Sequence, residues 1–322
     1  MNSSTRSIAA LAFAVIGASS SGAIAQQLVR VGLPVPGDAS HAPAAVAAEQ
    51  LGYYKAANLK VEITVYRGGA AAQEAMSAGA ADIINYFAPA VALAVSKGAK
   101  EKIVGAGSNR AGGWHYLVRS DSPVKTFKDL AGKKVGITTK ASTTDLLTLW
   151  MADRSGIAVQ TIPVGGGGLV PSLKTGQVDA IILFPGVTYR LLLAGEARSI
   201  FDFGKDSEPS LPDLWVASQE MIDKHPEQVR AFLGAVYRAV EHMQKNREFG
   251  LPLLKAFTKE ENEKALLMTY EDVTLKQSSD GVIQRDWIAR MVGVAAKAWG
   301  LKELTGMKID DYFTDRFIPG KK

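Results

Sequence analysis

The chain has 322 residues, of which 37 are Lys or Arg and 32 are Asp or Glu, so its formal net charge at pH 7 is +5. These charges are interspersed, which argues against a nucleic-acid-binding surface, and no apolar run beyond the N-terminal segment reaches membrane-spanning length. The absence of cysteine excludes disulfides, thiolate metal sites, thiol nucleophiles and a thiol-linked lipid anchor.

The first 25 residues have the pattern of a cleavable secretory signal. Arg6 provides a positive start, an apolar run covers residues 8–18, and small residues end the segment at Ala23-Ile24-Ala25. The apolar run is about half of the ~20 residues that a bilayer-spanning helix needs, so a retained anchor is the weaker interpretation. We therefore expect cleavage after Ala25 and a periplasmic, freely diffusing mature chain without a lipid anchor.

Short apolar, β-branched runs alternate with helical patterns along the rest of the chain. The runs predict strands at residues 29–32, 61–66, 82–85, 102–105, 135–138, 159–164, 179–183 and 215–218. The helical patterns cover residues 42–54, 69–78, 143–154, a segment that ends at 175, and 226–246. This alternation is typical of an α/β fold with parallel sheets that are covered by helices.

An internal repeat relates two parts of this pattern. Residues 64–98 align without a gap on residues 161–195 with eight identities, where composition alone gives about two or three. The identical pairs are Thr64/Thr161, Gly68/Gly165, Gly69/Gly166, Gly79/Gly176, Asp82/Asp179, Ile84/Ile181, Phe87/Phe184 and Gly98/Gly195. Ligands of such sheets bind outside the carboxyl ends of the strands. The repeat therefore predicts two similar lobes that share one cleft.

Five motifs, in this order and spacing, resemble one protein family. They lie at residues 51–55 with 61–62, 79–82, 130–135, 176–180 and 225–227. The chain resembles the periplasmic substrate-binding proteins of ABC transporters, in the branch for nitrate, sulfonates, taurine and thiamine-precursor pyrimidines. The resemblance implies the type II periplasmic-binding-protein fold, with two lobes, each a mostly parallel sheet flanked by helices, joined by two crossing strands. We expect lobe I at residues 26–116 and 218–322, and lobe II at 117–217.

Candidate ligand contacts follow from the positions of strand ends and helix starts. Asp38, Ser40 and His41 precede a helix whose free N–H groups suit an anion, although Ser40 as a simple cap and His41 as a solvated loop residue explain them equally well. Gly69 and Gly166 lie in equivalent turns where a backbone N–H can approach a ligand closely. Tight-turn geometry alone also accounts for these glycines.

The start of the helix at residue 143 is the anion site that we favour first. Ser142, Thr143 and Thr144 combine hydroxyl groups with free helix N–H groups, which together can hold a sulfonate or a carboxylate. Ser142 with Asp145 also matches a capping box, which needs no ligand.

Aromatic residues at strand ends are further candidates. Tyr86 and Phe87 follow one strand, Phe184 and Pro185 occupy the repeat-related place in the second lobe, and Trp114 lies near the crossover. Such side chains stack on planar ligands. Packing between the lobes is the competing interpretation.

Arg110 suits bidentate pairing with a carboxylate or sulfonate, the alternative being an ordinary surface arginine. The four histidines show no metal-binding spacing, and no nucleophile motif is present. We therefore expect no catalytic residue, no cofactor and no metal.

The expected function is solute binding for an ABC importer. A monomer would capture a small anionic organic solute, sulfonate-like or taurine-like or an aromatic carboxylate, by hinge closure. It would deliver the solute to the permease and ATPase subunits, meeting the membrane only through the permease and binding no nucleic acid. Two alternatives remain open. One is a thiamine-pyrimidine-precursor binding protein or biosynthetic enzyme on the same fold, and the other is a periplasmic ligand receptor for a sensor protein.

Overall fold

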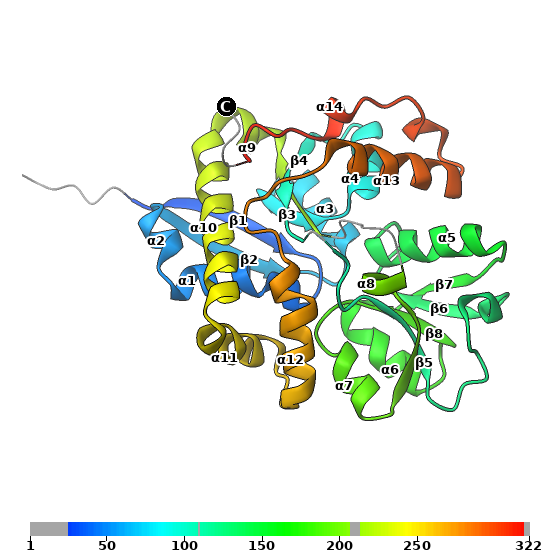
Figure 1. Ribbon diagram of the computed structural model, residues 1–322. Coiled ribbons are helices and arrows are strands. Elements are labelled where there is room, and N and C mark those ends of the chain that lie inside the picture. The colour runs from blue at the N-terminus through cyan, green and yellow to red at the C-terminus, as the bar shows by residue number, and fades with distance from the viewer. Residues whose placement is uncertain (1–24, 109, 207–212, 319–322) are drawn as a thin grey trace, which may run out of the picture.

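The computed structural model describes residues 25–108, 110–206 and 213–318 (Figure 1). The expected signal segment, apart from Ala25, lies outside these residues. Within the described ranges, no helix combines the length and the apolar character that crossing a bilayer requires.

Two five-stranded sheets form the centres of two lobes (Figure 1). The lobe I sheet has the order β2-β1-β3-β10-β4, with strands β1 (Gln27–Leu33), β2 (Leu59–Val65), β3 (Ile83–Tyr86), β4 (Glu101–Ala106) and β10 (Leu214–Ser218). The lobe II sheet has the order β7-β6-β8-β5-β9, with strands β5 (His115–Arg119), β6 (Lys134–Ile137), β7 (Gln160–Pro163), β8 (Ala180–Leu183) and β9 (Ala197–Asp202). Both sheets have one topology, in which β10 or β5 runs antiparallel to both neighbours. The expected two-lobe α/β fold with mostly parallel sheets is confirmed.

The sequence repeat corresponds to a structural repeat. β3 and β8 occupy equivalent positions in the aligned segments 64–98 and 161–195, and each is the central strand of its sheet. The carboxylate of Asp82 accepts a hydrogen bond from the backbone N–H of Arg30 at 2.8 Å. In the second copy, Asp179 accepts one from the backbone N–H of Lys134 at 2.8 Å. Each aspartate thus joins the start of one strand to the parallel neighbouring strand, β3 to β1 in lobe I and β8 to β6 in lobe II.

The chain crosses between the lobes twice. It leaves the lobe I sheet after Ala106 and enters that of lobe II at His115, then leaves after Asp202 and returns at Leu214. The lobe boundaries expected at residues 117 and 217 therefore fall within β5 and β10. We propose that the lobes divide within the two crossings, and the expected boundaries stay a prediction.

Helices cover both sheets. In chain order they are α1 (Ala48–Gln50), α2 (Tyr53–Ala56), α3 (Gly69–Ser77), α4 (Ala88–Ser96), α5 (Thr143–Ser155), α6 (Leu169–Lys174), α7 (Thr188–Leu193), α8 (Phe203–Asp206), α9 (Gln219–Lys224), α10 (Pro226–Lys245), α11 (Arg247–Thr258), α12 (Glu263–Asp272), α13 (Arg285–Ala298) and α14 (Ile309–Tyr312). The helix expected over residues 42–54 is broken. A π-helical turn at Pro43–Ala47 precedes α1, and Gly52, with φ of 68°, separates α1 from α2.

Alternation along β3 divides the lobe I interior in two, because successive strand residues face opposite sides of a sheet. Ile83 packs in a core shared with α10, where Phe232 and Val236 lie fully or almost fully buried. Ile84 packs in a second core that continues through lobe II. In that second core α13 contacts both α4 of lobe I and α5 of lobe II. One apolar interior thus connects the lobes.

Candidate functional site

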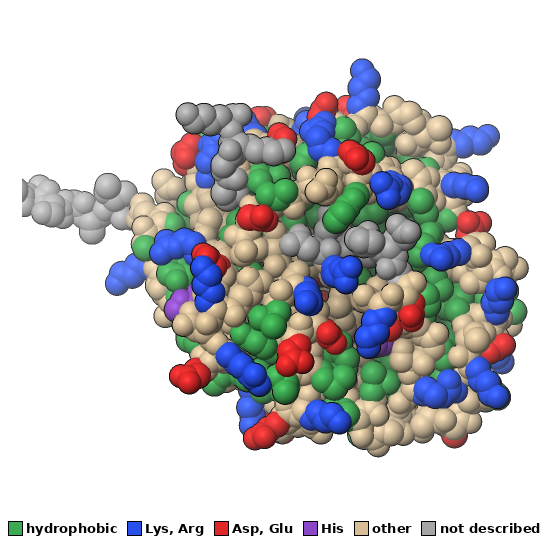
Figure 2. Space-filling model, in the orientation of Figure 1, with side chains coloured by type: hydrophobic (Ala, Val, Ile, Leu, Met, Phe, Trp, Pro, Cys, Tyr) green, Lys and Arg blue, Asp and Glu red, His purple; other side chains and the backbone are tan. Residues whose placement is uncertain are grey.

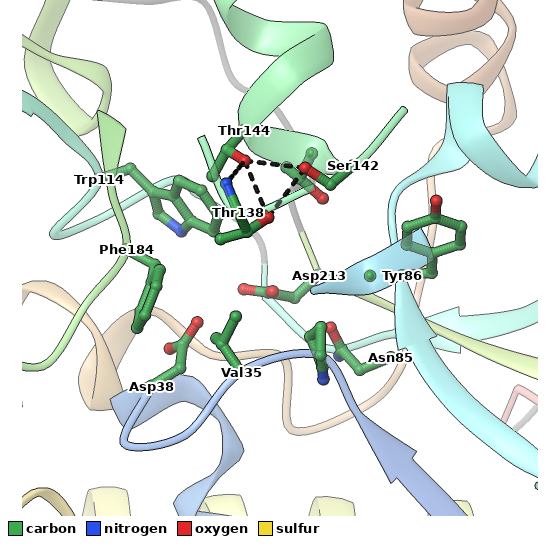
Figure 3. Close-up of a pocket in the computed structure, with 13 residues that line it drawn as sticks. Val35, Asp38, Asn85, Tyr86, Trp114, Thr138, Ser142, Thr144, Phe184 and Asp213 are labelled. Carbon is green, nitrogen blue, oxygen red and sulfur yellow. Dashed lines mark hydrogen bonds between the residues drawn. The ribbon is translucent and has the colours of Figure 1, made fainter. Parts of the chain in front are cut away.

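One small cavity lies where the two lobes meet (Figure 3). Its volume is about 20 Å³, which is room for about one water molecule. The lining residues come from both lobes and from both crossings, and they are Pro34, Val35, Asp38, Gly69, Asn85, Tyr86, Trp114, Thr138, Ser142, Thr143, Thr144, Phe184 and Asp213. The ends of strands β1, β3, β6 and β8 therefore converge here, as the rule for open α/β sheets requires.

Hydrogen bonds between described residues join the two lobes. They connect Ala39 N to Pro185 O at 3.1 Å, Gly166 N to Arg67 O at 3.1 Å, the Tyr86 hydroxyl to Ala141 O at 3.1 Å, and the Tyr189 hydroxyl to Asp272 Oδ2 at 2.6 Å. Backbone approaches backbone so closely that a Cβ at Gly186 would lie 2.4 Å from the carbonyl oxygen of Gly37. The lobes are therefore closed on each other.

Hydroxyl groups at the start of α5 form the lobe II wall of the cavity (Figure 3). Thr144 Oγ1 accepts the backbone N–H of Thr138 at 2.9 Å and lies 2.8 Å from Ser142 Oγ. Ser142 Oγ in turn donates to Thr139 O at 2.7 Å and accepts from Asp145 N at 3.4 Å. These hydroxyls mainly satisfy one another. Thr143, half-buried at the cavity edge, stands outside this network.

The aromatic wall is formed by Trp114 and Phe184, whose rings meet edge to face with centroids 6.4 Å apart. Both side chains are 5 % exposed. The indole N–H of Trp114 is buried and has no hydrogen-bond partner among the described residues. Such a donor is available to a ligand, since buried polar groups are normally paired.

The lobe I floor carries two carboxyl groups, which point into the cavity (Figure 3). Asp38 accepts hydrogen bonds from Ser40 N at 3.0 Å and Ser40 Oγ at 2.7 Å. Burial raises the pKa of Asp38 to about 7. Burial, together with the nearby Asp38, also raises the pKa of Asp213 to about 7. Among the described residues that line the cavity, these two are the acids, and none is Lys or Arg.

A larger groove opens next to the cavity and shares Thr138 with it. Its volume is about 950 Å³. It lies between Pro36 and residues 65–74 of lobe I on one side and residues 138–140 and 163–168 of lobe II on the other. Arg67, Lys140 and Glu74 line it. The glycine turn at 165–168, Gly166 included, belongs to this groove and not to the cavity.

The predicted site residues therefore lie in four places. The cavity lining contains Gly69, Tyr86, Trp114, Ser142, Thr143, Thr144 and Phe184. Gly166 lines the groove, whereas Ser40, His41, Phe87 and Pro185 are buried behind the lining, and Arg110 is exposed. His41 is not a solvated loop residue, since its side chain is 0 % exposed.

Sequence reasoning missed Asn85, Thr138 and Asp213. Asn85 and Thr138 end two strands that were predicted, so their position at a strand end was the signal that identifies them. Asp213 comes from the second crossing, immediately before β10, and no local pattern marks it.

On the exposed face shown in Figure 2, Lys and Arg side chains alternate with Asp and Glu side chains and form no extensive patch of one sign. The basic character implied by the net charge of +5 is therefore spread out on this face.

Comparisons with known proteins agree with this architecture. A family model described as NMT1/THI5 like matches residues 38–248. A protein of Bordetella bronchiseptica is 24% identical, with 90% of this chain and 95% of that chain covered and a TM-score of 0.80. The alkanesulfonate-binding protein SsuA from Xanthomonas axonopodis pv. citri, bound to MOPS, is 18% identical, with 87% and 94% covered and a TM-score of 0.71.

The periplasmic nitrate-binding protein NrtA from Synechocystis PCC 6803 is 15% identical, with 90% of this chain and 86% of that chain covered and a TM-score of 0.71. No curated protein matches at the level of sequence. The resemblance to periplasmic binding proteins of ABC importers is confirmed by the family model and these folds.

Proposed function

Since the chain belongs to the NMT1/THI5-like family, we propose that it is the solute-binding component of an ABC importer, exported to the periplasm. The observation that carries this proposal is a cavity enclosed by residues of both lobes. A solute that contacts both walls stabilises the closed arrangement over an open one by the difference between its affinities for the two. The permease then recognises the closed lobes.

The two acidic residues of the cavity change the charge that we expect of the ligand. We expected a small anionic solute, and the start of α5 with Thr143 offers such an anion N–H groups and a hydroxyl. On the opposite side, however, an anion would face Asp38 and Asp213. A free anion is therefore poorly matched, and we propose that positive charge accompanies it. That charge belongs either to the solute itself, as in taurine, or to a bound cation.

No chemical step is part of this proposal. The transport binding proteins among the similar folds support binding without turnover. The aromatic wall of Trp114 and Phe184 supports a solute with an apolar or planar part.

Native mass spectrometry of untagged protein, purified without denaturation, tests the proposal. We expect one bound small molecule per chain, released intact on unfolding, and a melting temperature that rises with that molecule. Flat melting curves across sulfonates, aromatic carboxylates, nitrate and aminopyrimidines would reject solute binding. A released product that differs from the added compound would identify an enzyme.

A further inference from the structure

Asp38, His41 and Asp213 form a compact cluster at the floor of the cavity. One potential ligand atom of each side chain lies within 4.8 Å of those of the other two. The three side chains are 1 %, 0 % and 4 % exposed, respectively. They come from the loop after β1, from the short 3₁₀ turn at Ala39–His41 and from the second crossing. Asp38 and His41 are neighbours in the sequence, but Asp213 is far from both, so no metal-binding spacing could reveal the complete cluster.

The cluster has unsatisfied polar atoms and excess negative charge. Neither ring nitrogen of His41 has a well-formed hydrogen bond among the described residues, although both are buried. An imidazole offers a metal ion the lone pair of a ring nitrogen. None of the described residues that line the adjacent cavity is Lys or Arg. Buried acids next to an imidazole without a well-formed hydrogen bond are costly, and a bound cation would relieve that cost.

We propose that Asp38, His41 and Asp213 bind one divalent transition-metal ion, with Zn²⁺ the best match. Two carboxylates and one imidazole are ligands that Zn²⁺ accepts, at distances of about 2.0–2.2 Å. Ligand atoms within 4.8 Å of one another reach such distances with a contraction of about 1 Å. Ser40 and Ser108 donate hydrogen bonds to the two carboxylates, at 2.7 Å and 3.3 Å, and so orient them.

Space favours a metal ion over an organic ammonium group at this position. The cavity above the cluster measures about 20 Å³, and His41 lies below it, fully buried. A single ion fits among the three side chains, and the cavity that Asp38 and Asp213 line is also lined by Ser142, Thr143 and Thr144 at the α5 start. There it would supply the positive charge that an anionic solute needs. This last step rests on the proposed function, whereas the metal site itself does not.

The first test measures Zn²⁺ binding to untagged, EDTA-treated protein by calorimetry and native mass spectrometry. We expect one Zn²⁺ per chain, and affinity reduced on the order of 100-fold in Asp213→Asn and in His41→Gln. Glu101→Gln is the matched control, because Glu101 is an equally buried carboxyl on β4 outside the cluster. It should bind Zn²⁺ like the wild type. Equal affinity in all four proteins, or no binding by the wild type, would overturn the site.

A measurement on the wild type keeps the test independent of whether the variants fold. Zn²⁺ should shift the NMR signals of one imidazole of the four, that of His41, with the other three assigned by single replacement. A shift of another histidine instead would also overturn the site.

The second test separates the metal from the solute. Melting curves are recorded with ethanesulfonate, which has no amino group, with EDTA or with Zn²⁺ present. We expect stabilisation only with Zn²⁺. Stabilisation in EDTA would show that the anion needs no metal and leave the proposed function intact. Zn²⁺ binding with no response to any solute would reject the proposed function and leave the metal site standing.

Discussion

The hydroxyl group of Tyr86, the last residue of β3 in lobe I, donates a hydrogen bond to the backbone carbonyl of Ala141 in lobe II across 3.1 Å. Ala141 has φ of +58°, a conformation that is uncommon for residues other than glycine. Its N–H is held by Asp145 Oδ2 at 2.9 Å. The carbonyl of Ala141 is thus held in place to accept the hydrogen bond from Tyr86 of the other lobe. This hydrogen bond exists only while the lobes are closed.

Tyr86→Phe should shift the balance towards the open form. A lost hydrogen bond costs about 0.5–1.5 kcal/mol, so solute affinity should fall by about 2-fold to 10-fold. The balance is measured by small-angle scattering or by fluorescence transfer between labels on the two lobes. The control is Tyr54→Phe, which removes a 2.8 Å hydrogen bond to Ala44 O within lobe I. It should lower the unfolding free energy without opening the cleft. Equal effects of both variants on affinity would contradict the assignment.

Substitutions of the neighbouring Thr143 and Thr144 should affect different properties, one the solute affinity and the other the stability. Thr144→Val removes the acceptor of the Thr138 N–H and should lower the unfolding free energy by about 1–3 kcal/mol. Thr143→Val should leave the melting temperature close to that of the wild type and weaken solute binding. Denaturant titration and calorimetry measure the two effects. A strongly destabilised Thr143→Val with normal affinity would refute this division.

Gly69 should tolerate no side chain. A Cβ at this position would lie 2.4 Å from Cε2 of Tyr86, so Gly69→Ala must displace the ring that makes the interlobe hydrogen bond. We expect a loss of about 1–3 kcal/mol in unfolding free energy, together with weaker solute binding. Gly167→Ala in the other glycine turn is the control, since a Cβ there meets nothing within 4 Å. Identical melting curves for the two variants would contradict this packing.

Glu101 should make the protein less stable as the pH rises. Burial raises the pKa of Glu101 from 4.5 to about 7, partly offset by a hydrogen bond from Gln73. Between these values the folded state holds a proton that the unfolded state has lost, so the unfolding free energy falls with increasing pH. The contribution of this group is about 3 kcal/mol over that window.

Glu101→Gln should therefore flatten the pH dependence between about pH 4.5 and 7. Chemical denaturation in EDTA at a series of pH values measures the slope. The buried Asp38 and Asp213 act in the same direction, so part of the slope should persist. An unchanged slope in the variant would show that Glu101 is ionised in the folded protein.

The sequence predicted those features that depend on local patterns. β3 and β8 were found because each is an apolar run that follows a Gly-x-x-Asp motif, and the aspartates prove to fasten the strands. The strands β5 and β9 were missed, although they pair antiparallel with each other. Their places depend on contacts between segments that are distant in the chain. The break in the first helix at Gly52 arises because that residue adopts φ of 68°.

The cavity lining includes residues that the sequence singled out in both lobes, Gly69 and Tyr86 in lobe I and Ser142, Thr143 and Thr144 in lobe II, and their role in binding stays a prediction. Ser142 and Thr144 have the side chains that are typical of a helix start. Because a strand directly precedes this helix, its start lies at the end of that strand, where ligands bind. Asp213 belongs to a crossing whose course is set by both lobes together, so its approach to Asp38 and His41 could not be read from either segment. The acidic floor therefore emerged only from the tertiary structure.

The helix α13 has a consequence for how tightly a solute is held. It packs on α4 of one lobe and on α5 of the other, with Ile288 and Val292 buried in the shared core. Separating the lobes must expose apolar surface on one side of α13 to water. Part of the free-energy cost of opening therefore arises far from the cavity. Residues that never touch a solute thereby set its residence time. Substitutions in α13 should therefore change the rate of solute release, whereas the residues that line the cavity determine which solute binds.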